Sequence, residues 1–178
     1  MYVGQWLKDT KFGKGRLILS NGNMYEGEWL NNNAHGNGTY ISDFEDNVRS
    51  KIIYVGEFRN NKQNGKGKQS VSQDNSCYTG DFADNAKHGK GELVFKDQSK
   101  YVGEFKDDIA SGLGKYYYPD GRVYEGDFKN NMKHGYGSYS MGNGMNYVGD
   151  FVEGRREGQG RLTWSDGRIY KGGFLKSL

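Results

Sequence analysis

Eight tyrosines recur at nearly constant intervals in this chain, and each opens the same short motif. Glycine follows two residues later, and Trp or Phe follows two residues after that, as in the segment that starts at Tyr124. The spacing between tyrosines is 23 residues five times, 24 once and 29 once. A period in this range indicates a repeat protein, in which one supersecondary unit is copied along the chain. The repeats begin at Tyr2, Tyr25, Tyr54, Tyr78, Tyr101, Tyr124, Tyr147 and Tyr170.

The first half of each repeat has the pattern of a β-strand. If each repeat is numbered from its tyrosine, positions 1, 3 and 5 are Tyr, Gly and an aromatic residue, whereas positions 2 and 4 are mostly polar or charged. Alternation with a period of two predicts a strand. Position 8 is Asn, Asp or Gly in all seven full repeats. These residue types tolerate a positive φ, so we predict a turn there.

The second half of each repeat predicts a partner strand. Glycines occupy positions 12 and 14, and a further alternating stretch follows them. We predict a register with position 1 opposite 16, 3 opposite 14 and 5 opposite 12, which sets aromatic rings over glycines. Asn21-Gly22, Asp120-Gly121 and Asp166-Gly167 predict turns into the next repeat. The predicted fold class is therefore all-β, an elongated single-layer antiparallel meander of repeated hairpins in one domain, residues 1–178.

Composition favours such a thin structure over a compact globule. Only 34% of the residues are hydrophobic and 29 are glycine, whereas a compact domain usually has about half of its residues apolar. Residues 1–151 hold 19 basic and 19 acidic side chains, so the net charge of +3 resides in residues 152–178. A nucleic-acid-binding protein would carry a larger basic surface, and we predict no nucleic-acid partner.

The motifs Tyr-x-Gly-x-(Trp/Phe), Gly-x-Gly-x-(Leu/Tyr) and (Asp/Asn)-Gly together resemble the MORN repeat (membrane occupation and recognition nexus). The resemblance covers seven full repeats and a truncated eighth. The chain departs from the family pattern at position 8, where Asn or Asp replaces the usual glycine except at Gly154, and at Gln69, where Leu or Tyr is expected. The second repeat also carries extra residues within 42–53, which we predict to form an insertion loop whose Phe44 and Val48 contribute partner specificity.

The resemblance implies a scaffold or adaptor in a cytoskeletal or ciliary assembly, or at a membrane. A single-layer sheet has no second layer over its apolar side, so we predict that the aromatic column forms a partly open trough for a helix or extended peptide. The alternative, that these rings only stack on neighbouring repeats, stays open. The predicted partner-binding residues are Trp6, Tyr25, Trp29, Tyr54, Phe58, Tyr78, Phe82, Tyr101, Phe105, Tyr124, Phe128, Tyr147 and Phe151.

An alternative function is peripheral membrane or phosphoinositide binding through the basic C-terminal end. The residues concerned are Arg155, Arg156, Arg161 and Arg168, although Glu153, Glu157 and Asp166 dilute their charge. Stable membrane anchoring generally needs a larger polybasic patch or a second signal. We therefore place this function second.

Nothing in the sequence pattern indicates catalysis, so we predict a non-enzymatic protein without metal or cofactor. The histidines at position 11, one per repeat, would lie too far apart to share an ion. The Gly-Lys-Gly segments lack the following helix that a phosphate-binding loop requires. The acidic residues at position 4 are expected to pair with basic residues at position 15 across each hairpin.

Cellular setting and assembly are also expectations at this stage. A single cysteine, Cys77, and the lack of a recognisable leader indicate a cytoplasmic protein. Neither end shows an evident cap, so the terminal strands meet a second copy of the chain or a larger assembly, or the sequence is a fragment of a longer protein. Of these alternatives we expect an assembly, which includes a homo-oligomer through the repeat ends.

Overall fold

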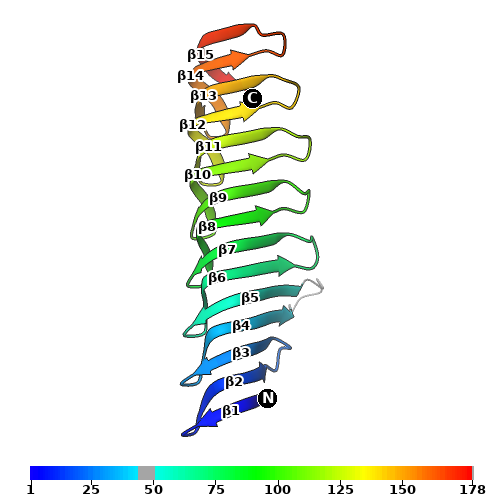
Figure 1. The fold of residues 1–178 in the computed structure, drawn as a ribbon, viewed down its shortest axis with the longest axis vertical. Coiled ribbons are helices and arrows are strands. Elements are labelled where there is room, and N and C mark those ends of the chain that lie inside the picture. Colours follow the sequence, from blue (N-terminus) through cyan, green and yellow to red (C-terminus); the bar gives the residue numbers. More distant parts are fainter. Residues whose placement is uncertain (44–50, 178) are drawn as a thin grey trace. The chain divides into compact units, whose positions relative to one another are not determined.

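A computed structural model describes residues 1–43 and 51–177. In this part of the chain there are fifteen β-strands and no helix, and the strands follow one another antiparallel in sequence order. The chain divides into two compact units, Met1–Gly89 and Lys90–Leu178, which are treated separately below. Within each unit, every strand pairs with its neighbours in sequence, so the predicted all-β meander of hairpins is confirmed (Figure 1).

The strands are short and of similar length. The first unit contains β1 (Tyr2–Leu7), β2 (Thr10–Ile18), β3 (Met24–Leu30), β4 (Asn33–Asp43), β5 (Lys51–Arg59), β6 (Lys62–Val71) and β7 (Cys77–Ala83). The division between the units falls within β8 (Ala86–Val94). The second unit contains β9 (Lys100–Lys106), β10 (Ile109–Tyr117), β11 (Val123–Lys129), β12 (Met132–Ser140), β13 (Asn146–Val152), β14 (Arg155–Thr163) and β15 (Ile169–Ser177).

A two-residue turn joins the two strands of each repeat. Asn130 and Asn131 have φ values of 51° and 64°, and two consecutive positive φ values define the type I′ turn that suits the twist of a hairpin. The turn predicted at position 8 is confirmed, and position 7 shares its conformation. Lys8 and Glu153 also occupy position 7 with φ of 48°, a conformation that is costly for long side chains.

In six repeats the tyrosine ring lies against two glycines of its own hairpin. A Cβ atom added to Gly126 would lie 2.7 Å from the Tyr124 hydroxyl, and one added to Gly137 would lie 2.6 Å from Cε2 of the same ring. The Tyr124 hydroxyl donates a hydrogen bond to the carbonyl of Asp127 at 2.8 Å. The glycines at positions 3 and 14 are thus required by the close approach of the ring.

The register agrees with the prediction at two of three pairs. Tyr124 lies opposite Tyr139 and Gly126 opposite Gly137, as predicted, but Phe128 lies opposite Lys133 at position 10. The expectation that position 5 faces position 12 of the same repeat was wrong. A bulge places three residues of β12 opposite a single residue of β11, and Gly135 at position 12 has a φ of 55° and pairs with Phe151 of the next repeat. Bulges of this kind bend the strand that carries them.

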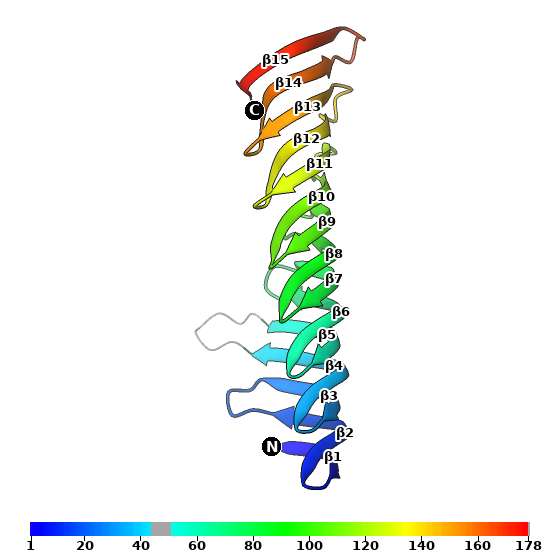
Figure 2. The same ribbon diagram turned by 90° about the vertical axis from the view of Figure 1, so that its left-hand side faces the viewer.

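The bend gives the hairpins of the first unit a curved cross-section. In Figure 2, the tight turns and the longer loops of these hairpins lie on the same side, and the middles of the strands lie on the other. Along the inside of the curve, Tyr54 packs edge-on against Phe58 of its own repeat at 5.1 Å and Phe82 of the next at 4.9 Å. The aromatic residues therefore form the core of a protein that has a single sheet layer.

The paired strands extend into the segment predicted as an insertion loop. Ser42 pairs with Ile52, and Asp43 pairs with Lys51, so both described ends of residues 42–53 belong to β4 and β5. Phe44 and Val48 lie outside the described residues, and their role in partner specificity stays a prediction.

Candidate functional site

The aromatic trough predicted from the sequence is not open. Twelve of the thirteen predicted partner-binding rings are at most 7% exposed, and Tyr54, Tyr124 and Tyr147 are fully buried. Each ring is enclosed by glycine-bearing strands beneath it and by rings of adjacent repeats at its sides, so the prediction of a partly open trough was wrong. Trp6 is the exception, at 59% exposure. The buried rings are Tyr25, Trp29, Tyr54, Phe58, Tyr78, Phe82, Tyr101, Phe105, Tyr124, Phe128, Tyr147 and Phe151.

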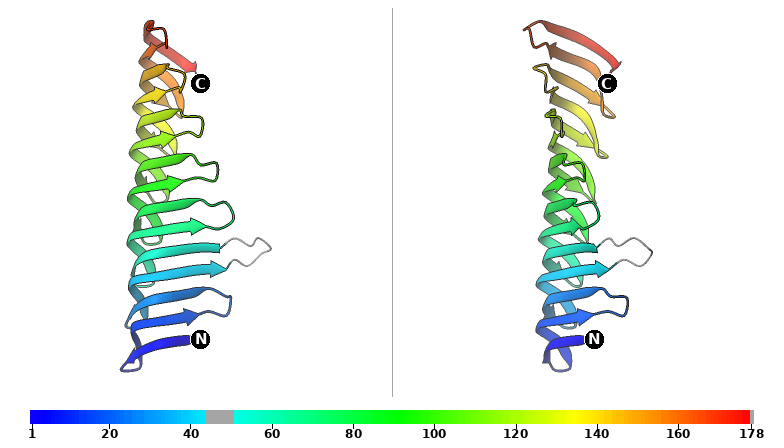
Figure 3. Two further views of the ribbon diagram at one scale, coloured as in Figure 1. Left: turned by 45° about the vertical axis from the view of Figure 1, so that its right-hand side comes forward. Right: turned by 90° about the vertical axis from the view of Figure 1, so that its right-hand side faces the viewer.

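A groove lies above these rings in the first unit, between the tight turns and the longer loops. Its volume is about 640 Å³. The tight-turn side supplies amide side chains, the loop side supplies further amides and a tyrosine, and a core ring forms part of the floor. Figure 3 shows the longer loops of the first unit, such as the one between β2 and β3, along one edge of its strands. None of the ten lining residues is charged: Asn21, Asn23, Tyr40, Ser42, Ile52, Phe58, Asn61, Gln63, Gln69 and Asn85.

Asparagines at position 8 fix the tight-turn side of this groove. The Asn61 side chain accepts a hydrogen bond from the Ala34 amide at 2.8 Å, and the Asn61 amide donates to the Ala34 carbonyl at 3.0 Å. Asn85 makes the same two bonds to Gln63, at 2.8 and 3.0 Å. Each turn is thus bound to position 10 of the preceding repeat, which explains why Asn replaces the family glycine here.

Three groups in the groove retain hydrogen-bonding capacity. Among the described residues, the side chains of Gln63 and Gln69 have no hydrogen-bond partner, and the buried Ser42 hydroxyl has none either. Tyr40, by contrast, is held by the Asn23 side chain, whose Nδ2 donates to the tyrosine hydroxyl at 2.9 Å. Gln69 was recognisable in the sequence as a departure from Leu or Tyr. No sequence pattern distinguished Gln63 or Ser42, because their positions in the groove depend on the bend.

The corresponding surface of the second unit is aromatic and cationic. The Arg122 guanidinium lies 4.7 Å from the Tyr118 ring centre and donates to the Tyr139 hydroxyl at 2.9 Å. The Lys133 ammonium lies 4.6 Å from the Tyr139 ring and 5.8 Å from the Tyr118 ring. Burial, followed by the nearby positive charges of Arg122 and Arg156, lowers the pKa of Lys133, while burial raises the pKa of Tyr118 to about 12.

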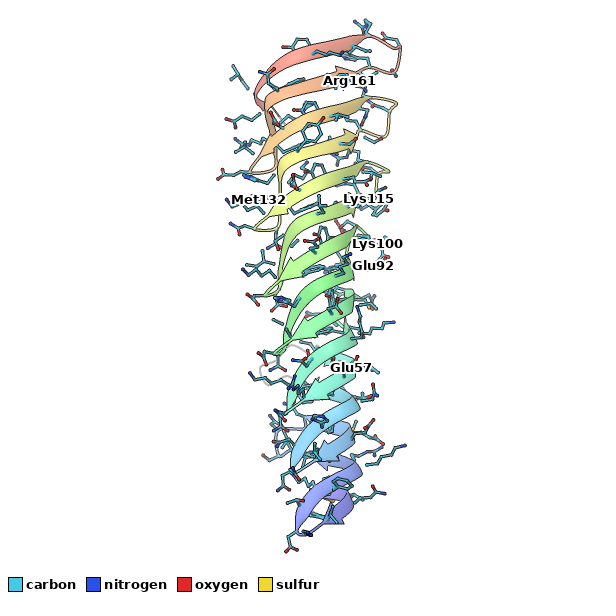
Figure 4. The ribbon with its side chains drawn as sticks, turned by 60° about the vertical axis from the view of Figure 1, so that its left-hand side comes forward. Glu57, Glu92, Lys100, Lys115, Met132 and Arg161 are labelled. Atoms are coloured by element: carbon cyan, nitrogen blue, oxygen red, sulfur yellow. The ribbon has the colours of Figure 1, made fainter. Side chains whose placement is uncertain are left out.

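The opposite, outer face is occupied by charged residues that pair differently from the prediction. Position-4 carboxylates accept hydrogen bonds from the backbone across the bulge, as Asp127 does from the Tyr136 amide at 3.0 Å. Position-15 cations pair instead with position 2 of the next repeat, as Lys115 does with Glu125 at 3.0 Å. Figure 4 shows Lys115 at one edge of the ribbon and Met132, the first residue of β12 after a tight turn, at the other.

The four arginines proposed for lipid binding do not form one patch. Arg156 lies opposite Phe151 and Arg161 opposite Val148, so these two side chains belong to opposite faces of the sheet because alternate residues of β13 face opposite ways. Arg168 pairs with Asp166 at 2.7 Å and lies 5.5 Å from the Trp164 ring. Arg155 is exposed at a turn.

The histidines at position 11 contact the repeat tyrosines through their backbone carbonyls. The Tyr124 hydroxyl contacts the carbonyl of His134 at 3.2 Å, and Tyr25 contacts that of His35 at 3.4 Å. Within residues 1–43 and 51–177, no group of three His, Cys, Asp or Glu side chains is placed to hold a metal ion. The same residues include no helix long and apolar enough to cross a bilayer.

Comparison with known proteins supports the repeat assignment. The family model described as MORN repeat matches residues 2–24, 25–43, 54–70, 78–100, 101–121, 124–145 and 147–167. A search of curated proteins found no match. Among solved structures, the chain is similar to the SAS-4 (dCPAP) TCP domain of Drosophila melanogaster, determined in complex with a proline-rich motif of Ana2 (dSTIL). The identity is 14%, the TM-score is 0.54, and the match covers 91% of this chain and 84% of that chain.

At this identity the structural match shows a shared fold alone. The family match is more specific, because its seven segments begin at the repeat tyrosines and together cover most of the sequence. The truncated repeat that begins at Tyr170 lies beyond the matched segments. The chain belongs to the MORN repeat family.

Proposed function

We propose that this chain is a non-enzymatic binding module that holds an extended segment of a partner protein in the groove of the first unit. The observation that carries this proposal is the neutral, amide-lined groove of about 640 Å³. It replaces the aromatic trough as the binding surface, because the rings themselves are buried.

The chemistry of the groove suits a peptide backbone. An amide side chain has both a donor and an acceptor, and can therefore pair with the carbonyl and N–H groups that an extended peptide presents. Gln63 and Gln69 offer two such amides, with no competing partner among the described residues. The half-buried Tyr40 lines the groove and adds an aromatic ring against which an apolar or proline side chain can pack.

The lining also argues for a protein rather than a charged ligand. Lipid headgroups and nucleic acids are bound mainly through Lys and Arg, and none of the lining residues within 1–43 and 51–177 is charged. The SAS-4 TCP domain, which shares the fold, was determined with a proline-rich peptide. We extend this mode of recognition to the present chain as part of the proposal, together with the cytoplasmic, cytoskeletal or ciliary setting that the resemblance implies.

The proposal is tested by selecting peptides from a displayed random library against the whole chain and mapping the best binder by NMR. We expect the amide signals of Gln63, Gln69 and neighbouring residues to shift. The variant Gln63→Leu/Gln69→Leu should weaken binding at least tenfold, because each lost hydrogen bond is worth about 1 kcal/mol. Lys68→Gln is the matched control, since adjacent strand residues face opposite sides. Equal binding by the double variant in its folded state would refute the proposal.

A further inference from the structure

We propose that the aromatic and cationic surface of the second unit binds a carboxylate side chain of a partner protein, with the Lys133 ammonium as its direct contact. We call this surface the Lys133 site and define it by Tyr118, Arg122, Lys133 and Tyr139. The inference rests on the proposed function, since it assumes that the protein partner also contacts the second unit.

The first argument is the state of the Lys133 ammonium. It is half-buried and lies within 6 Å of four aromatic rings, those of Tyr118, Tyr124, Tyr139 and Phe151. Among the described residues it has neither a hydrogen bond nor an ion pair with a carboxylate. An ammonium carries three donors, and a partly desolvated charge without an acceptor is unfavourable until an anion supplies one.

The second argument is the local charge. The charged groups that act on Lys133 are the cations Arg122 and Arg156, and both disfavour its protonated form. The carboxylate of Asp120 is engaged elsewhere, because both of its oxygens accept from Arg122 Nε, at 2.9 and 2.7 Å. The Lys133 site is therefore net positive, and a carboxylate brought next to Lys133 would relieve repulsion as well as satisfy its donors.

The third argument concerns which anion fits. Phosphate groups are recognised best by several guanidinium forks, and the fork of Arg122 is already used by Asp120 and the Tyr139 hydroxyl. One point charge between flat tyrosine rings suits a single carboxylate flanked by apolar or proline residues. In the part of the first unit that the structure describes, the groove has no charged lining residue, so this preference for a carboxylate would belong to the second unit.

The test uses three capped heptapeptides, Ac-PPPEPPP-NH2 and the same sequence with Gln or Lys at the centre, titrated into the full chain and followed by NMR. We expect the Glu peptide to bind about tenfold more tightly than the Gln peptide, because hydrogen bonds to charged groups are the stronger ones, and the Lys peptide to bind weakest. Signals of Tyr118, Lys133 and Tyr139 should shift. Lys133→Met should abolish the Glu preference, whereas Lys115→Met, on the outer face, should retain it.

Each other result has a defined meaning. Equal affinity for the Glu and Gln peptides, with shifts on the groove side, would overturn the carboxylate site and leave the peptide-binding function standing. Absence of binding by all three peptides would overturn the carboxylate site, while the library selection would still judge the proposed function separately. In a further outcome, phosphatidylserine vesicles bind the chain, Lys133→Met loses this binding, and the peptides show no preference for Glu. This result would overturn the peptide carboxylate and identify a membrane surface as the ligand of Lys133. If Lys133→Met does not fold, the comparison of peptides on the unaltered chain still decides.

Discussion

Asn131 makes two hydrogen bonds to one residue of the preceding repeat, and removing one of them tests how the repeats are joined. Its side-chain oxygen accepts from the Ala110 amide at 2.8 Å, and its own amide donates to the Ala110 carbonyl at 3.1 Å. Asn131→Gly keeps the positive φ of 64° without strain but deletes the acceptor. Ala110 is only 7% exposed, so water reaches its amide poorly.

The expected loss is about 1–3 kcal/mol in the free energy of unfolding of this region, the cost of leaving a buried amide without a partner. In amide hydrogen exchange, this corresponds to exchange of the Ala110 amide about 5- to 150-fold faster. Asn131→Asp is the control, because it preserves an acceptor in the same place. Unchanged exchange at Ala110 in Asn131→Gly would refute the assignment of the bond as a stabilising link between repeats.

The seventh repeat offers the reverse experiment. Gly154 occupies the equivalent position and donates its amide to the Lys133 carbonyl at 2.8 Å, but it has no side chain to accept from the Lys133 amide. Gly154→Asn should therefore raise the free energy of unfolding by about 0.5–1.5 kcal/mol, measured by urea denaturation. A destabilised variant would show that the Asn side chain does not act through this bond.

Three further predictions follow from strain, close packing and ionisation. Glu153→Asn should stabilise the chain by about 1 kcal/mol, because Asn tolerates the φ of 48°, and a lower melting temperature would contradict this. Gly137→Ala should cost about 3 kcal/mol or more, since its Cβ would meet the buried Tyr124 ring at 2.6 Å, and an unchanged denaturation midpoint would count against the role of the glycine. Burial raises the pKa of Tyr101 to about 12. The stabilisation that the neutral, buried phenol contributes is therefore complete below about pH 10 and is lost as the pH rises through about 12. A melting temperature that stays constant from pH 9 to 12 would exclude this linkage.

Removal of the Lys133 charge gives a last prediction in the same set. The folded-state pKa of Lys133 is lowered, so the unfolded chain binds its proton more readily and the stability of the unaltered protein rises with pH through that folded pKa. Lys133→Met should therefore melt at the same or a higher temperature at pH 7, and its advantage should shrink at alkaline pH. A variant that is clearly less stable at pH 7 would show that the ammonium stabilises the fold rather than serving a ligand.

The sequence determined the repeat, the strands and most of the pairing. Alternation of Tyr, Gly and Phe is a local pattern, and the Asn and Asp residues at position 8 tolerate a positive φ, so the hairpins and their turns could be predicted from local chemistry alone. The pairs Tyr124–Tyr139 and Gly126–Gly137 were predicted for the same reason. The family followed from the same residues, because its motif is the repeat itself.

The tertiary structure alone decided which surface is open. Because of the bulge before Gly137, Phe128 pairs with the residue at position 10 of its repeat instead of the residue at position 12. The resulting bend encloses the rings that a flat sheet would have exposed. This bend, together with contacts between successive repeats, decides whether Gln63 and Gln69 line a groove and whether Lys133 lies among aromatic rings. No local sequence pattern records these contacts. A periodic sequence specifies the unit that is copied, whereas the curvature and the contacts between copies determine where a partner can bind.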